Sequence, residues 1–383
     1  MIRWKRVLLW LLLLFALGGA TPARCEETAL DAALNEVIDG LDIETLEEAI
    51  QSDDPFAATG GFRETLRKIA QGEMTLSFDE MMQLLLSRFA SAWMGSLWRI
   101  TRLCAPAVIW GILRRLSGRS AEVGQMVCSL LVCVFLAQDL SEHTQLCLVT
   151  MERMSSAMQG LFPLLLTMMA AVGGSAGSAL VQPAVVTAAS SMTGLIRHVT
   201  VPLTAGAAVL TMLCYMGEGI RVPRLAKMAR QMASWSLGVC FTVFIGVLAP
   251  RGVTAAAVDG VTIRTAKYAM DNLIPVVGGL FADTVDALIG SGMLVQSALG
   301  VTGLILIVSL CIGPMCQTLA SAVLYKLTAA LMQPVSEGQL ADCIHEFSEL
   351  LMLLFIIQLC AAAMFLMLIA QLIAVSGMTM MLR

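Results

Sequence analysis

The sequence predicts an all-α, polytopic helical membrane protein. Of its 383 residues, 58% are hydrophobic and 14% are charged, and the mean hydropathy is +0.81. This composition leaves too little polar surface to cover a soluble globule of this size. The apolar residues form long runs between short polar or basic loops, the pattern of several membrane-spanning helices. Two runs contain clustered glycines and prolines, which predict broken or re-entrant helix pairs.

Residues 1–25 have the pattern of a signal peptide. Three basic residues precede the apolar run 7–17, and small residues follow it. The run of about eleven residues is too short to span a bilayer, which needs roughly twenty. We therefore expect the chain from Glu26 onward to begin outside the cytoplasm.

Residues 26–92 form an acidic, exported segment. Fifteen of the 28 acidic residues lie between Glu26 and Trp93, against four basic ones, a balance that excludes nucleic acid as a partner. Apolar residues at helical spacing predict amphipathic helices in 28–50, 62–71 and 79–92. The segment is either a small helical cap on the membrane domain or a docking surface for a protein partner outside the membrane.

Residues 93–383 form the predicted membrane domain, and basic residues indicate its topology. Three arginines at 114–119 follow the first predicted span, and the loop 218–230 is the most basic in the chain. Positive charge marks the cytoplasmic side, in agreement with an exported N-terminal segment. An acidic loop is expected at 337–349. The predicted spans are about 93–113, 123–138, 199–217, 232–250, 314–332 and 350–373.

Two further apolar stretches, 161–195 and 273–313, contain helix-breaking residues. Each is predicted to be either a helical hairpin or a re-entrant pair. Broken backbone at membrane depth is tolerated only where it is buried in protein or lines a water-filled cavity. The predicted break positions are Pro163, Gly173, Gly174, Gly177, Pro183, Pro275, Gly278, Gly279, Gly290, Gly292 and Pro314.

These stretches also match each other at an offset of about 112 residues. Ser156–Pro163 aligns with Tyr268–Pro275, and Pro202 aligns with Pro314. Internal repeats of membrane segments are typical of many transport folds. The match predicts a parallel repeat with copies at about 141–250 and 253–373.

The stretch 251–275 keeps polar and charged residues at tight spacing between apolar runs. It predicts an interfacial amphipathic helix, where unpaired charge is costly and usually functional. Just beyond it, two carboxylates share one helical face and either line a polar path, pair with the nearby cations, take part in proton coupling, or are simply solvated. The candidate polar path or interface consists of Asp259, Arg264, Lys267, Asp271, Asp283 and Asp286.

No pattern predicts catalysis, a metal or a cofactor. The stretch His345–Glu349 resembles a zinc-protease helix but has glutamate in place of the second histidine. The glycine-rich run 173–178 lacks the lysine of a phosphate-binding loop and is better explained by close helix packing. We therefore expect a protein that is not an enzyme.

Several of these stretches resemble the stage III sporulation protein AE family of endospore-forming bacteria. The resemblance is carried by the run Asp259–Lys267, by Ile274-Pro275-Val276, and by Phe281-Ala282-Asp283. It continues in Tyr325-Lys326-Leu327 and Leu331–Pro334. The ending Met378–Met381 also fits this family.

The resemblance implies a membrane component of the channel or secretion complex between mother cell and forespore, needed for late forespore gene expression and spore formation. The implied partners are the other stage III A proteins, including a partner ATPase and exported ring-forming subunits, and indirectly the forespore stage II Q protein. The implied location is the mother-cell-derived outer forespore membrane, with the N-terminal segment in the intermembrane space. The alternatives are a self-sufficient secondary transporter and a non-conducting scaffold of the same complex.

Overall fold

The computed structural model is helical throughout the part of the chain that it describes. The described residues are 61–71, 78–115, 119–171, 187, 189–216, 223–248, 278–336 and 339–381, and no strand occurs among them. The all-α prediction is therefore confirmed. The elements are α4 (Phe62–Ala70), α5 (Phe78–Arg115), α6 (Arg119–Ala171), η2 (Ile196–Thr200), α8 (Val201–Met216), α9 (Pro223–Leu248), α11 (Gly278–Ser336) and α12 (Gln339–Met381).

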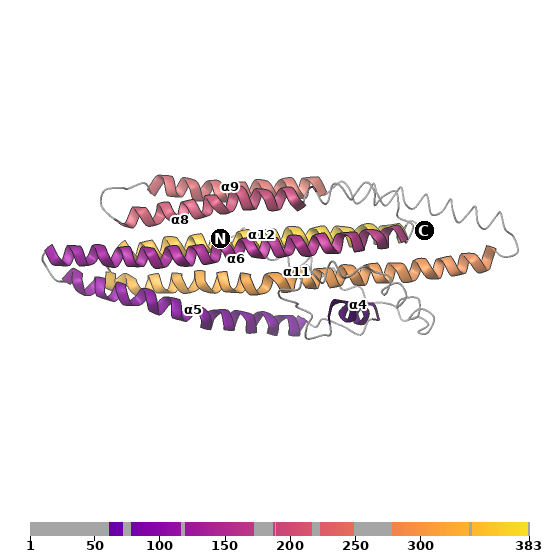
Figure 1. The fold of residues 1–383 in the computed structure, drawn as a ribbon, viewed down its shortest axis with the longest axis horizontal. Helices are drawn as coiled ribbons and strands as arrows, with labels where there is room; N and C mark the ends of the chain where they lie inside the picture. Colours follow the sequence, from indigo (N-terminus) through magenta and orange to yellow (C-terminus); the bar gives the residue numbers. More distant parts are fainter. Residues whose placement is uncertain are drawn as a thin grey trace.

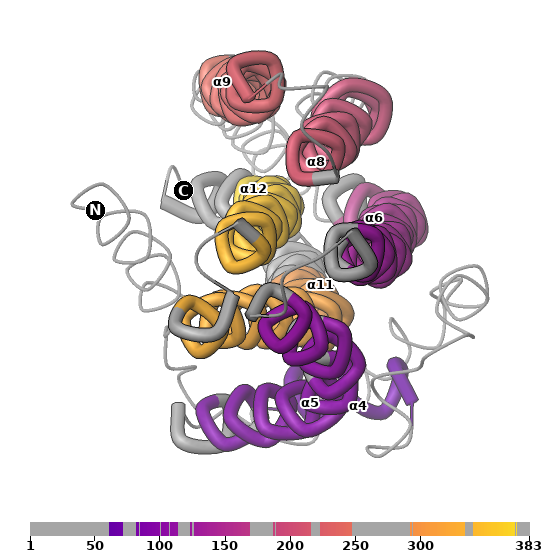
Figure 2. Tube along the Cα trace, turned by 90° about the vertical axis from the view of Figure 1, so that its left-hand side faces the viewer, coloured from indigo at the N-terminus to yellow at the C-terminus, as the bar shows by residue number. Residues whose placement is uncertain are grey.

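The long helices lie side by side in an elongated bundle (Figure 1). Viewed from the end, α8 and α9 form one side, α6 and α12 lie in the middle, and α11 and α5 lie beyond them (Figure 2). At 1.5 Å per residue, the 59 residues of α11 span about 90 Å and the 53 residues of α6 about 80 Å. Both lengths exceed the hydrocarbon core of a bilayer, about 30 Å.

Side-chain contacts fix the direction of each helix. Along α6, Asp139, Met154 and Leu161 meet residues 325, 311 and 303 of α11, so these two helices run antiparallel. The α12 helix runs parallel to α6. Cys133 of α6 contacts Cys343 of α12, and farther along both helices Leu161 and Ile369 lie beside the same residue of α11, Gly303. Since α11 and α12 adjoin in sequence and pack along each other, they form a long antiparallel hairpin.

Four helical stretches are long and apolar enough to cross a membrane. They are Met126–Met168, Ala189–Tyr215, Leu294–Gln333 and Leu340–Gln371. The predicted spans at 93–113 in α5 and 232–250 in α9 are not among them, within the residues that the structure describes. Charge explains why α5 is not a candidate span, because Arg99 and Arg102 interrupt its apolar run.

Several predicted helix breaks are wrong. Pro163 lies inside α6, and Gly290, Gly292 and Pro314 lie inside α11. A proline removes one backbone hydrogen bond, but packing along neighbouring helices stabilises the rest of a long membrane helix. Gly278 and Gly279 are the first residues of α11. The predicted positions Gly173, Gly174, Gly177, Pro183 and Pro275 lie outside the described residues.

Two other predictions concern the polar segments. The helix predicted at 62–71 is confirmed as α4. The helix predicted at 79–92 forms the first part of α5, which continues without interruption to Arg115. The predicted acidic loop at 337–349 is helical from Gln339 onward. Residues 1–60, with the predicted signal peptide and most of the acidic segment, lie outside the described residues, and the internal repeat stays a prediction.

Glycines of α11 allow a close approach to α12. A Cβ atom on Gly300 would lie 2.3 Å from Cγ1 of Ile373, and one on Gly303 would lie 3.0 Å from Cδ1 of Leu161 in α6. Small residues at helix interfaces permit such contacts in membranes. By contrast, a Cβ on Gly313 of the same helix would meet no atom within 4 Å.

We expect Gly300→Ala to lower the free energy of unfolding by about 1–3 kcal/mol, because the added methyl group overpacks the α11–α12 contact. Gly313→Ala is the control and should leave stability unchanged or raise it by up to about 1 kcal/mol, since alanine favours helix. Thermal unfolding in detergent measures the stability of both variants, with the reactivity of the buried cysteines as the signal for unfolding. Equal stability of the two variants would contradict the close packing.

Candidate functional site

A cluster of ionisable side chains lies buried between α5, α6 and α11. Its centre is Asp139 of α6, with only 6% of its side chain exposed. The hydroxyl of Tyr325 in α11 donates a hydrogen bond to Oδ2 of Asp139. Two guanidinium groups of α5 face the other oxygen, with Arg99 Nη1 and Arg102 Nη2 each 3.9 Å from Oδ1.

Arg99 connects this carboxylate to two further residues of α6. Its Nη2 donates to Oε1 of Glu142 at 2.5 Å, and its Nη1 lies 3.3 Å from Nε2 of the buried His143. One turn before Arg99, the hydroxyls of Ser96 and Ser321 lie 3.2 Å apart, which adds a direct polar contact between α5 and α11. The guanidinium of Arg99 therefore holds α5 against α6.

Tyr325 extends the cluster to a fourth helix. Its ring packs edge-on against Phe347 of α12, with centroids 5.2 Å apart and an interplanar angle of 85°. Aromatic pairs favour this geometry. The ring of Tyr325 thus packs between α11 and α12, and its hydroxyl donates a hydrogen bond to the carboxylate of Asp139.

A second group of ion pairs joins α9, α11 and α12. Arg230 of α9 donates to Oε2 of Glu346 at 2.6 Å and to the backbone carbonyl of the same residue at 3.1 Å. Lys326 of α11 contacts Oε1 of Glu349 at 2.7 Å. Glu346 and Glu349, two of the three glutamates of the predicted acidic loop, are therefore neutralised by cations from other helices.

The outward face of α6 changes chemistry along its length. Steps of three and four residues connect its exposed positions, which share one side of the helix. In the first part these positions are apolar: Val123, Val127, Leu131 and Val134. Farther along, the exposed positions include the polar residues Gln138, Ser141, Gln145, Glu152, Gln159 and Thr167. The apolar residues Val149 and Pro163 are also exposed in this part. We call residues 138–167 of this side the polar face.

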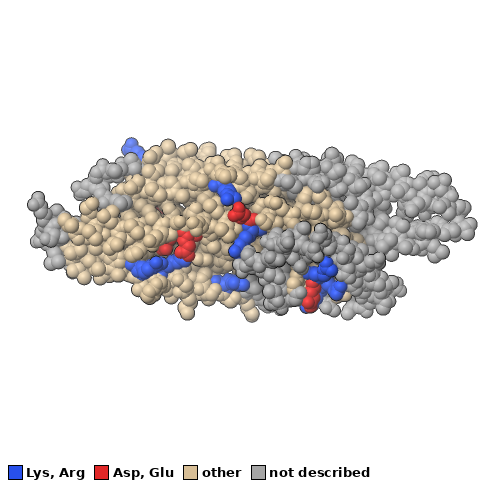
Figure 3. Space-filling model, in the orientation of Figure 1, with Lys and Arg blue, Asp and Glu red and all other residues tan. Residues whose placement is uncertain are grey.

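The outer face of α9 is the contrasting case. Its exposed large apolar residues lie at helical spacing and are Leu225, Met228, Met232, Trp235, Val239 and Val243, with Arg224, Lys227, Gln231, Ser234 and Thr242 exposed beside them. Such a face suits lipid, whereas the polar face of α6, inside the candidate span Met126–Met168, does not. Figure 3 shows charged side chains in a few separate groups on a largely uncharged surface.

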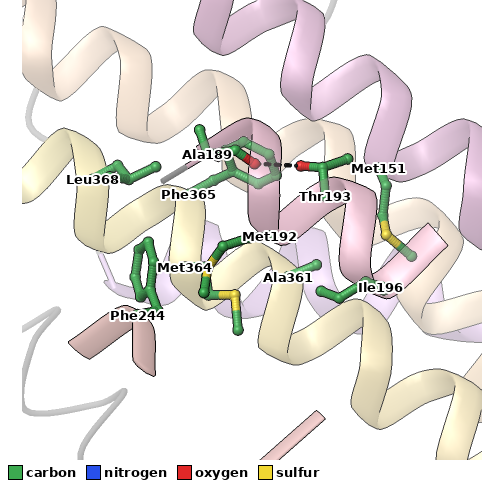
Figure 4. A pocket seen from close by; sticks show the side chains of 10 residues that line it. All are labelled: Met151, Ala189, Met192, Thr193, Ile196, Phe244, Ala361, Met364, Phe365 and Leu368. Carbon is green, nitrogen blue, oxygen red and sulfur yellow. Dashed lines mark hydrogen bonds between the residues drawn. The ribbon is translucent and has the colours of Figure 1, made fainter. Parts of the chain in front are cut away.

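Methionine and aromatic side chains fill the interior between α6, α9, α12 and the helical residues 189–195 (Figure 4). Met151, Met192, Met364, Phe244 and Phe365 surround a gap of about 10 Å³. This space is at the lower limit for a single water molecule, and its lining is apolar. Here the methionines serve as packing residues.

The predicted site residues are largely untested by the structure. Asp259, Arg264, Lys267 and Asp271 lie outside the described residues. Asp283 and Asp286 lie in the first turns of α11, but their side chains are not described. Among the described residues, no three histidine, cysteine or acidic side chains gather at a spacing that suits a metal ion.

The sequence reasoning did not single out Asp139, Glu142 and His143, and it named Tyr325 only among the residues that carry the family resemblance. A signal was present, because Arg99 and Arg102 are three residues apart on one helix and Asp139 and Glu142 are three apart on the next. Complementary pairs at this spacing face each other when two helices pack antiparallel. Charge inside apolar helices usually marks an ion or substrate path or a proton relay.

We expect Asp139→Ala to lower the free energy of unfolding by about 3–5 kcal/mol, because it removes the hydrogen-bond acceptor of Tyr325 and the buried counter-charge of Arg99. Glu142→Gln is the matched control. Glu142 is half exposed, so its loss should cost at most about 1 kcal/mol. Thermal unfolding in detergent compares them, and a smaller effect for Asp139→Ala than for Glu142→Gln would contradict the central role of Asp139.

Comparison with known proteins agrees with the sequence resemblance. The family model described as stage III sporulation protein AE matches residues 61–376. Stage III sporulation protein AE of Bacillus subtilis (strain 168) is 32% identical over 232 residues, or 61% of this chain. The matched region spans 58% of that relative's length, and no solved structure matches. Because the family model covers most of the sequence, the chain belongs to the stage III sporulation protein AE family.

Proposed function

We propose that this chain is a membrane component of the channel or secretion complex that joins mother cell and forespore. The observation that carries the proposal is the polar face of α6. A helix in lipid cannot leave a row of amides, hydroxyls and a carboxylate against hydrocarbon, so this face meets water or another protein. The isolated chain is thus incomplete in a bilayer, as a subunit of an assembly is.

The partners of this proposal are the other stage III A proteins. Energy comes from the partner ATPase, and exported ring-forming subunits continue the path outside the membrane towards the forespore stage II Q protein. The chain lies in the mother-cell-derived outer forespore membrane, with its N-terminal segment in the intermembrane space. Family membership supports this placement.

One observation favours a second function, a self-sufficient secondary transporter. The buried carboxylate of Asp139, with a tyrosine and two arginines around it, has the composition of a coupling site in a membrane protein. Loss of flux without loss of assembly in the double variant Asp283→Asn/Asp286→Asn would favour transport through this chain. Loss of assembly alone would favour a non-conducting scaffold.

An in-frame deletion in the native host tests the proposed function directly. We expect normal growth and engulfment, followed by failure of a late forespore reporter and loss of heat-resistant spores. Expression of the gene from a second locus should restore both. Normal spore yield in the deletion strain would overturn the proposal.

A second experiment tests the polar face. We expect Gln145→Leu combined with Gln159→Leu to leave membrane insertion intact and to lower spore yield at least about tenfold, because an apolar face no longer suits water or a polar partner. The control is Gln231→Leu, the same change on the exposed, mostly apolar surface of α9. Spore counts and co-purification of the other stage III A proteins measure the effect. Equal spore yields in the two strains would contradict the role of this face.

A further inference from the structure

A polar cavity opens between the polar face of α6 and the helical residues from Ala189 onward. Its volume is about 270 Å³, space for about nine water molecules at ~30 Å³ each. This is slightly below the usual range for drug-sized ligands, so it suits a smaller molecule. The lining residues are Leu148, Met151, Glu152, Ser155, Ser156, Gln159, Thr193 and Arg197.

One ion pair dominates the electrostatics of this cavity. Arg197 Nη1 lies 3.0 Å from Oε1 of Glu152, and the two side chains are 49% and 58% exposed. An ion pair this exposed contributes about 0–1 kcal/mol to stability, so a ligand can separate the two charges at low cost. Arg230–Glu346 differs, because it is more buried and has an additional backbone hydrogen bond.

A change in helix type places Arg197 at the cavity. Residues Ile196–Thr200 form a π-helical segment, η2, between the helical residues 189–195 and α8. Single π-helical turns inside α-helices are rare and frequent at functional sites. Here Ile196 and Thr200 stay buried while Arg197 is exposed toward α6.

The pair lies on two long apolar helices, where charge is unfavourable unless it meets water, a ligand or an opposite charge. Glu152 and Arg197 belong to Met126–Met168 and Ala189–Tyr215, two of the four candidate membrane spans. Charges at membrane depth are costly unless they meet water, a ligand or each other with good burial, and this pair is half exposed. The cavity beside it supplies the space for water or a ligand.

The chemistry of the lining selects the ligand. The cavity carries one positive and one negative group, so a simple anion or cation would satisfy one and leave the other unpaired. A zwitterion satisfies both, with hydroxyl and amide partners available from Ser155, Ser156 and Gln159. We propose that this cavity binds a small zwitterion of amino-acid size, its carboxylate on Arg197 and its ammonium on Glu152.

This inference rests on the proposed function. It deepens that function, because it names the class of molecule that binds beside the polar face of α6. A bidentate guanidinium–carboxylate contact gives orientation as well as affinity. The apolar side chains of Leu148 and Met151 cover one wall of the cavity and suit the aliphatic carbons of such a molecule.

Direct binding to the purified, full-length protein in nanodiscs tests the assignment. The probe is radiolabelled L-glutamine, with unlabelled glutaramate and 4-aminobutanamide as competitors that lack the ammonium and the carboxylate respectively. We expect saturable binding, with each competitor at least about tenfold weaker than unlabelled glutamine. Absence of saturable binding, or competition by either analogue that is as strong as competition by unlabelled glutamine, overturns the proposal.

Variants locate the site. Glu152→Gln and Arg197→Gln should each raise the Kd for glutamine at least about tenfold, whereas Arg224→Gln, the same change on exposed α9, should not. If a charge variant fails to fold, Ser156→Leu tests the site by filling the cavity without touching the ion pair, and it should abolish binding. Unchanged binding in Ser156→Leu and in the folded charge variants overturns the assignment.

The two proposals fail by different readouts. If the wild-type protein binds no glutamine while the deletion strain fails to sporulate, the zwitterion site is wrong and the sporulation complex stands. If the deletion strain sporulates normally, the complex is wrong whatever the binding assay gives. Glutamine binding together with a spore defect in Glu152→Gln supports both.

Discussion

The carboxylate of Asp139 must be neutralised, because it lies almost fully buried among long apolar helices. Tyr325 and two arginines do so, and each comes from a helix other than α6. The position of α5 beside α6 and the rotation of α11 about its axis are therefore coupled to one side chain. Phe347, packed on the ring of Tyr325, extends this constraint to α12.

The same cost of polar groups in hydrocarbon governs the outside of the bundle. The exposed surface of α9 is mostly apolar, whereas α6 changes from apolar to polar residues near Gln138. One helix therefore presents two environments along its length. A bundle whose helices exceed the membrane thickness can place one part in lipid and another against water or partner subunits.

Continuity of the helices depends on packing as much as on local preference. Pro163 and Pro314 each remove a backbone hydrogen bond, yet α6 and α11 continue past them. Glycines that suggested breaks in α11 instead belong to a helix that approaches α12 closely at Gly300. Glycine in a membrane helix therefore indicates close contact as readily as it indicates a turn.

The sequence by itself determined the all-helical membrane class, the helix α4 and the family, because composition, hydrophobic periodicity and motif residues are local properties. Arg99 and Arg102 interrupt an apolar run of α5. Only the tertiary structure decided their partners, since Tyr325 meets Asp139 across 186 residues and such contacts depend on which helices pack together. For the same reason, the Glu152–Arg197 cavity follows from the placement of two helices and a π-helical segment.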